Sequence, residues 1–129
     1  MISKQDEKYS KERIKGKESV IKVAAIQTIP VFGEKDENVN RQIELIKQAS
    51  TNGNSLIVLP ELGNTGYIFN NRNELEKLAE EIPNGPTCQE WLSVCKEEKV
   101  YLCAGITERD KGKYYNSAVL IGPGGFIYP

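Results

Sequence analysis

The sequence contains no histidine among its 129 residues. Catalysis by a serine–histidine or cysteine–histidine pair within this chain is therefore excluded, as are most metal sites built on imidazole. Cysteine is also scarce. The three cysteines cannot all form disulfides with one another, and their spacing matches no zinc-binding pattern. We therefore expect neither a bound metal nor a cofactor.

Long apolar runs and an excess of one charge are absent too. No apolar stretch approaches the roughly 20 residues of a membrane span, and the lysine-rich amino terminus lacks the apolar core of a signal peptide. The formal net charge is −1, so there is no basic surplus for binding nucleic acid. These features predict a soluble, cytoplasmic protein with no membrane or nucleic-acid partner.

The length is that of one ordinary domain, and composition divides the chain into two parts. Residues 1–19 are polar, dense in lysine and glutamate, and without apolar periodicity, which predicts a disordered extension. Residues 20–129 carry alternating strand and helix patterns. Residues 20–27 and 56–59 are short apolar, largely β-branched runs, which predict two strands.

An amphipathic helix is predicted between these two strands. Asp36 can cap it, and Val39, Ile43 and Ile46 recur at helical spacing. Asn52 and the glycine after it supply a stop signal. Strand, helix and strand with short connections form a βαβ unit, whose two strands lie parallel.

The second half of the chain predicts two more helices and three more strands. Asn73 can cap a short helix, and a capping-box pattern starting at Thr87 can open another. Residues 100–106 and 115–121 predict an antiparallel pair of strands, and residues 126–128 begin a fifth strand.

The candidate functional residue is Glu61, which directly follows Pro60 at the end of the 56–59 strand. Proline stops regular strand pairing, so this glutamate is expected just past the carboxyl end of a buried strand, where open α/β folds place their chemistry. Partial burial at such a place raises the pKa of a carboxyl group and suits it to act as a general base. The alternative is a helix-capping or solvated glutamate.

The cysteines are expected to be structural. Cys95 falls on the apolar face of a predicted helix and Cys103 in the middle of a predicted strand. Cys88 falls in the first turn of a helix, a position that lowers the pKa of a thiol. No cation or base is visible beside Cys88 in the sequence, so a nucleophilic role is not favoured for it.

Several short segments resemble the nitrilase superfamily, the carbon–nitrogen hydrolases, in the order expected for that family. Residues 59–62 with 65–67 resemble its catalytic-glutamate segment. The further matching segments are residues 23–27, 104–109, 115–118 and 122–125. The resemblance covers nearly all of residues 20–128 and about the first half of a family domain. It implies an α/β fold, the first half of an αββα sandwich, with a mixed sheet and flanking helices.

The resemblance also implies a chemistry. Glu61 matches the general base that takes the proton of a cysteine thiol and later activates water, while a lysine helps to stabilise the oxyanion. In the family that lysine and cysteine follow later in the chain, so residues 20–129 are expected to be a truncated domain, inactive alone. The substrate would be an amide, an N-carbamoyl compound or a nitrile. Residues 65–67 and 106–109 favour amidases and N-carbamoyl hydrolases over nitrilases.

Two other hypotheses about the function stay open. A half sandwich with exposed faces could be a non-catalytic interaction or assembly module, and we expect it to form oligomers with itself or with nitrilase-like chains. A small nucleotide-binding α/β module has the right alternation of elements. That reading ranks last because the glycines of residues 122–125 are not followed by the Gly-Lys-Ser/Thr ending of a phosphate loop.

Overall fold

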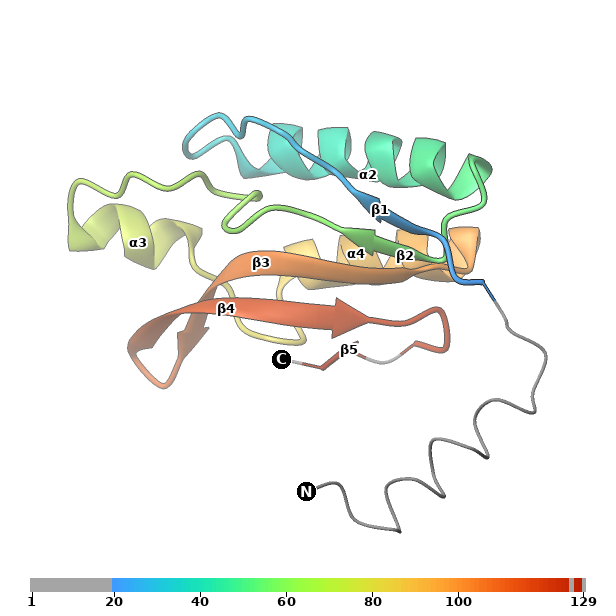
Figure 1. The fold of residues 1–129 in the computed structure, drawn as a ribbon. Coiled ribbons are helices and arrows are strands. Elements are labelled where there is room, and N and C mark those ends of the chain that lie inside the picture. The colour runs from blue at the N-terminus through green and yellow to red at the C-terminus, as the bar shows by residue number, and fades with distance from the viewer. Residues whose placement is uncertain (1–19, 126, 129) are drawn as a thin grey trace, which may run out of the picture.

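The computed structural model describes residues 20–125 and 127–128, which form one mixed five-stranded sheet in the order β1-β2-β3-β4-β5 (Figure 1). The strands are β1 (Val23–Ala25), β2 (Leu56–Val58), β3 (Tyr101–Asp110), β4 (Lys113–Ile121) and β5 (Ile127–Tyr128). The first three strands are parallel, and β3, β4 and β5 pair antiparallel. The extension predicted for residues 1–19 lies outside the described residues.

Three helices accompany the sheet in the described part of the chain: α2 (Lys35–Thr51), α3 (Arg72–Leu78) and α4 (Pro86–Glu98). Helix α2 connects β1 to the parallel strand β2, so the predicted βαβ unit is confirmed. Helices α2 and α4 lie side by side on one face of the sheet, and α3 lies at its end (Figure 1). The predicted α/β class, with a mixed sheet and flanking helices, is confirmed.

The hydrophobic core lies between the sheet and the pair α2–α4. Strand β3 illustrates this arrangement. Successive side chains of a strand point to opposite faces of the sheet. Leu102, Ala104 and Ile106 are buried toward the helices, whereas Tyr101 is exposed on the other face. The remaining buried apolar residues of this core are Val39, Ile46, Ile57, Leu59, Cys88, Trp91, Val94, Cys95, Val100, Val119 and Ile121.

The other face of the sheet, which we call the open face, carries no helix among the described residues. Val23 is 57% exposed and Leu120 is 39% exposed on this face, although both belong to regular strands. A sheet buried on both faces would cover such side chains. The described residues therefore form one sheet layer with its helices, as in one half of a two-sheet sandwich.

The starts of the helices differ from the predictions. Asp36 lies in the first turn of α2, and the N-cap is Glu34. Asn73 lies inside α3, because the side chain of Asn71 accepts the hydrogen bond from the Glu74 N–H. The third difference is at Thr87, predicted as the first residue of a capping box. Helix α4 begins one residue earlier at a proline, and Thr87 is buried.

Candidate active site

Glu61 lies where the sequence predicts, just past the carboxyl end of β2. The Leu59 N–H still donates to the Cys103 carbonyl oxygen at 2.8 Å, so the pairing of β2 with β3 continues to the residue before Pro60. The chain then turns away through Leu62, whose φ is +44°. The side chain of Glu61 is exposed, in contrast to the partial burial considered from the sequence.

Two residues of the β3–β4 pair define the surroundings of Glu61. Asn116, on β4, donates a short hydrogen bond from its side-chain nitrogen Nδ2 to Glu61 Oε1. Gly105, on β3, lies against the Glu61 backbone, since a Cβ placed there would be 2.6 Å from the Glu61 Cα. The carboxylate is therefore oriented from one side and its backbone is packed from another.

Glu61 and Asn116 line a hollow of about 320 Å³. Its other lining residues are Leu59, Cys103, Ala104, Gly105, Ser117 and Ala118. A carboxylate at the mouth of a hollow, held by one amide donor, can accept a proton from a group bound beside it. A larger hollow of about 410 Å³, lined in part by Lys35, Asp36 and Glu90, does not include Glu61.

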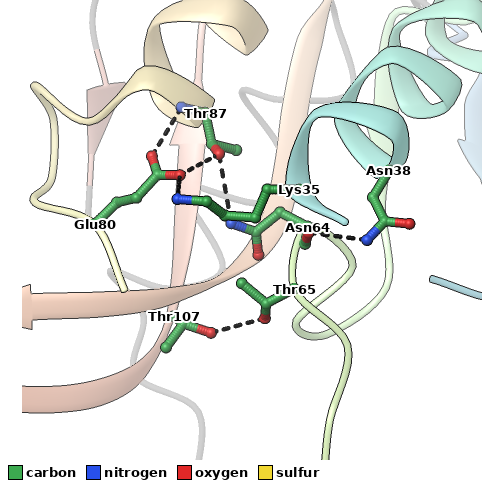
Figure 2. A network of polar contacts seen from close by, with 7 residues as sticks. All are labelled: Lys35, Asn38, Asn64, Thr65, Glu80, Thr87 and Thr107. Atoms are coloured by element: carbon green, nitrogen blue, oxygen red, sulfur yellow. Dashed lines mark hydrogen bonds and ion pairs between the residues drawn. The ribbon is translucent and has the colours of Figure 1, made fainter. Parts of the chain in front are cut away.

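The loop that follows Glu61, residues 62–66, is buried, although its residues other than Leu62 are polar or small. Asn64 and Thr65 are fully buried. The Asn38 side chain donates from Nδ2 to the backbone carbonyl of Asn64 at 3.0 Å. The hydroxyl groups of Thr65 and Thr107 lie 3.0 Å apart (Figure 2). These contacts fix residues 62–66 against both α2 and β3.

Glu80 is a buried residue that the sequence reasoning missed. It is 4% exposed, and its carboxylate accepts hydrogen bonds from Lys35 Nζ at 2.7 Å, from the Thr87 N–H at 2.8 Å and from Thr87 Oγ1 at 2.7 Å (Figure 2). Glutamate is usually exposed, and the surrounding pattern suggested only a helical segment. No signal in the single sequence separates Glu80 from its exposed neighbour Glu81.

Cys88 and Cys95 are fully buried in the core, as expected for structural cysteines. Burial, followed by the negative charges of Glu80 and Glu108, raises the pKa of the Cys88 thiol to about 12. Burial alone raises the pKa of Cys95 to about 12. The lowering considered for the first turn of a helix is therefore outweighed at Cys88.

Cys103 differs from the other two cysteines, because it is half-buried and lines the hollow that contains Glu61. Residues 20–125 and 127–128 contain no group of three histidine, cysteine, aspartate or glutamate side chains placed to hold a metal ion. In the same part of the chain, no helix has the length and apolar character needed to cross a membrane. A cytoplasmic location stays a prediction.

Comparison with known proteins identifies relatives of this chain. The family model described as carbon-nitrogen hydrolase matches residues 22–128. A nitrilase of Pyrococcus abyssi is 44% identical over 108 residues, which are 84% of this chain and 41% of that protein. The omega-amidase NIT2 of Mus musculus is 35% identical over 110 residues, which are 84% of this chain and 38% of that protein. The chain thus spans about two fifths of the length of these relatives.

Solved structures agree with the sequence relatives. An N-terminal amidase superposes with a TM-score of 0.74 at 28% identity, covering 84% of this chain and 27% of that one. Nit3 of Saccharomyces cerevisiae, a member of branch 10 of the nitrilase superfamily, superposes with a TM-score of 0.71 at 27% identity, covering 83% of this chain and 41% of that one. The chain therefore belongs to the carbon–nitrogen hydrolase family of the nitrilase superfamily, and its sheet and helices match part of the nitrilase fold.

Proposed function

We propose that this chain supplies the general base, Glu61, of a carbon–nitrogen hydrolase that acts on a non-peptide C–N bond in an amide, an N-carbamoyl compound or a nitrile. The observation that carries the proposal is the position of the Glu61 carboxylate, past the end of β2, beside a hollow and hydrogen-bonded by Asn116. An oriented carboxylate suits proton abstraction from a thiol and then from water.

The reaction needs two further groups, a cysteine nucleophile and a lysine. Cys88 and Cys95 are buried, with the pKa of each thiol raised to about 12, so they are protonated and unreactive at neutral pH. Cys103 lines the hollow beside Glu61 but lies within strand β3, and the assay of the chain alone tests whether it can act as the nucleophile. We propose that the nucleophile and the lysine come from the part of the enzyme that the relatives contain and this sequence does not span. This chain would then be inactive alone and active when that part is present.

Ammonia release from a panel of simple amides and N-carbamoyl amino acids tests the proposal. The chain is assayed alone and then mixed with the carboxyl-terminal part of the Pyrococcus abyssi nitrilase, and size-exclusion chromatography reports whether the two associate. We expect turnover only in the mixture. Turnover by the chain alone would contradict the proposed division of the catalytic groups.

The variant Glu61→Gln tests the role of the base itself. It keeps the size and shape of the side chain but cannot accept a proton, so turnover of the mixture should fall by about a hundredfold or more. The matched control is Glu44→Gln, which changes an exposed glutamate on α2 and should leave turnover unchanged. Turnover of Glu61→Gln near that of the parent chain would remove Glu61 from the catalytic role.

A second candidate function is a non-catalytic assembly module, which docks on itself or on a nitrilase-like chain. The open face favours it, since Val23 and Leu120 would be covered in such a complex. Association with the relative's fragment without any turnover would support this function. Failure to recover any nitrilase-like protein by affinity capture would count against it.

A further inference from the structure

The buried carboxylate of Glu80 is the centre of a polar network on the helix side of the sheet (Figure 2). A buried charge is stable only when it is paired and hydrogen-bonded. Lys35, 21% exposed, provides the opposite charge, and Thr87 provides two donors. The space around the carboxylate is tight, because a Cβ on Gly85 would be 2.7 Å from Glu80 Oε2. The position of this carboxylate is therefore well determined.

The network reaches the loop after Glu61 through side chains. Thr87 donates its hydroxyl hydrogen to Glu80, which directs the hydroxyl lone pairs elsewhere. The Asn64 side chain donates from Nδ2 to that hydroxyl oxygen over 3.5 Å, the longest contact of the network. The backbone carbonyl oxygen of Asn64 accepts a hydrogen bond from Asn38 Nδ2. Asn64 is thus held between α4 and α2.

The network reaches the same loop through the backbone as well. The Glu80 N–H donates to the Thr107 carbonyl oxygen at 3.0 Å, and the Arg109 N–H donates to the Glu80 carbonyl oxygen at 2.8 Å. Glu80 is thereby fixed beside β3 at Thr107, whose hydroxyl lies 3.0 Å from that of Thr65. The two routes meet at adjacent residues of the loop, three and four positions beyond Glu61.

We propose that Glu80 and Thr87 are positioning residues for Glu61, which they hold in place through the buried loop 62–66. The proposal rests on the general-base role proposed for Glu61. Strand β3 links the two ends of the arrangement, because Thr107 contacts the loop and Gly105 contacts the Glu61 backbone. The loop cannot shift without disturbing hydrogen bonds on three elements, α2, α4 and β3. The backbone of Glu61, directly before this loop, is therefore held in a position from which its carboxylate accepts the hydrogen bond of Asn116.

Hydrogen exchange of the chain alone tests this proposal, with Thr65 and Gly66 as probes because their N–H groups donate within the loop to the Leu62 carbonyl. In Thr87→Val, which keeps the shape but removes the hydroxyl, these two amides should exchange about tenfold faster relative to amides of β3 and β4. Thr87→Ser restores the hydroxyl and should return the exchange to within about twofold of the parent chain.

The side-chain amide signal of Asn116 in an NMR spectrum gives a second readout, since that group donates to Glu61. We expect it to move in Thr87→Val and in Glu80→Gln, and to stay in place in Thr87→Ser. The control is Lys47→Ala, which removes an exposed ion pair with Glu97 and should affect neither readout. If Glu80→Gln does not fold, the two Thr87 variants still decide the matter.

Equal acceleration of exchange in the loop and in the sheet, with no movement of the Asn116 signal, would assign the network to general stability and overturn the proposal. Unchanged exchange of Thr65 and Gly66 in Thr87→Val would overturn it too. Both readouts are independent of turnover. A failure of Glu61→Gln to lower activity would therefore contradict the proposed function. The exchange and NMR results would still test separately whether Glu80 and Thr87 position the Glu61 segment.

Discussion

The Glu61 backbone lies so close to Gly105 that a single added carbon would collide with it. A Cβ on Gly105 would be 2.6 Å from the Glu61 Cα and 2.9 Å from the Leu62 nitrogen, closer than non-bonded atoms approach. The atoms it would meet are backbone, so no side-chain rotation relieves the overlap. The position of the candidate base therefore depends on the absence of a side chain on the neighbouring strand.

Gly105→Ala should consequently displace the Glu61 segment. We expect the free energy of unfolding to fall by about 2–3 kcal/mol, as for an overpacked core site, when measured by urea denaturation. Gly112→Ala is the comparison. A Cβ at Gly112 would meet no atom within 4 Å, but the backbone there is left-handed, so this variant should lower the free energy of unfolding by only about 1 kcal/mol. Equal losses for the two variants would show that the close approach at Gly105 is relieved at little cost.

Asn116 should be needed for the orientation of Glu61 rather than for folding. Asn116 is exposed, so Asn116→Ala should change the free energy of unfolding by less than about 0.5 kcal/mol. In an enzyme completed with the carboxyl-terminal part of a relative, the same change should lower kcat by about tenfold, because a charge-assisted hydrogen bond to the base is lost. An unchanged kcat would mean that Asn116 does not orient the base.

The three cysteines should differ in their reactivity toward a thiol reagent at pH 8. With the pKa raised to about 12, only about 10⁻⁴ of the Cys88 or Cys95 thiol is ionised at that pH, and both are buried. Cys103, half-buried beside Glu61, should be modified first, as mass spectrometry of the labelled peptides can report. Labelling of Cys88 in the folded chain ahead of Cys103 would contradict the burial described above.

The buried thiols of Cys88 and Cys95 should make the fold less stable at alkaline pH. Burial raises the pKa of each from 9.0 to about 12 in the folded chain, so between these values the unfolded chain loses protons that the folded chain keeps. The free energy of unfolding should therefore decrease as the pH rises from about 9 toward 12. Urea denaturation at several pH values measures this decrease. Between pH 9 and 12 the free energy of unfolding should fall less steeply with pH in Cys88→Ala than in Cys103→Ala.

A hydrogen bond in the core supports a further prediction. Trp91 Nε1 donates to Gln42 Oε1 at 3.1 Å, and both side chains are buried. Trp91→Phe should lower the free energy of unfolding by about 2 kcal/mol or more, since it leaves the amide oxygen unpaired and removes volume. In a double-mutant cycle with Gln42→Leu, the combined loss should be smaller than the sum by at least about 0.5 kcal/mol. Additive losses would show that the two residues are not coupled.

Much of the sheet could be predicted because its signals are local. The apolar run before Pro60 identifies β2 and places Glu61 at its end, and the spacing of Val39, Ile43 and Ile46 identifies α2. The turn between residues 110 and 113 separates β3 from β4, and their antiparallel pairing is as predicted. Each of these features depends on neighbouring residues alone.

The surroundings of Glu61 could not be predicted, because they join residues far apart in the chain. Asn116 is 55 positions from Glu61, and Thr107 is 42 positions from Thr65. Thr87 has the residue type and spacing of a helix cap, yet in the structure its N–H and hydroxyl both bind Glu80. Within residues 20–125 and 127–128, Glu80 is the only buried glutamate, and a periodicity argument cannot distinguish it from the exposed ones.

The long antiparallel pairing of β3 with β4 has a consequence for the order of folding. The nine paired positions lie within residues 102–121 and are joined by a tight turn, so this hairpin needs little loop closure to form. The parallel pairs are less local, because the paired residues are 33 positions apart for β1 and β2 and 45 positions apart for β2 and β3. Glu61 precedes Gly105 and Asn116 in the chain, so its surroundings are complete only once both strands of this hairpin lie beside the end of β2.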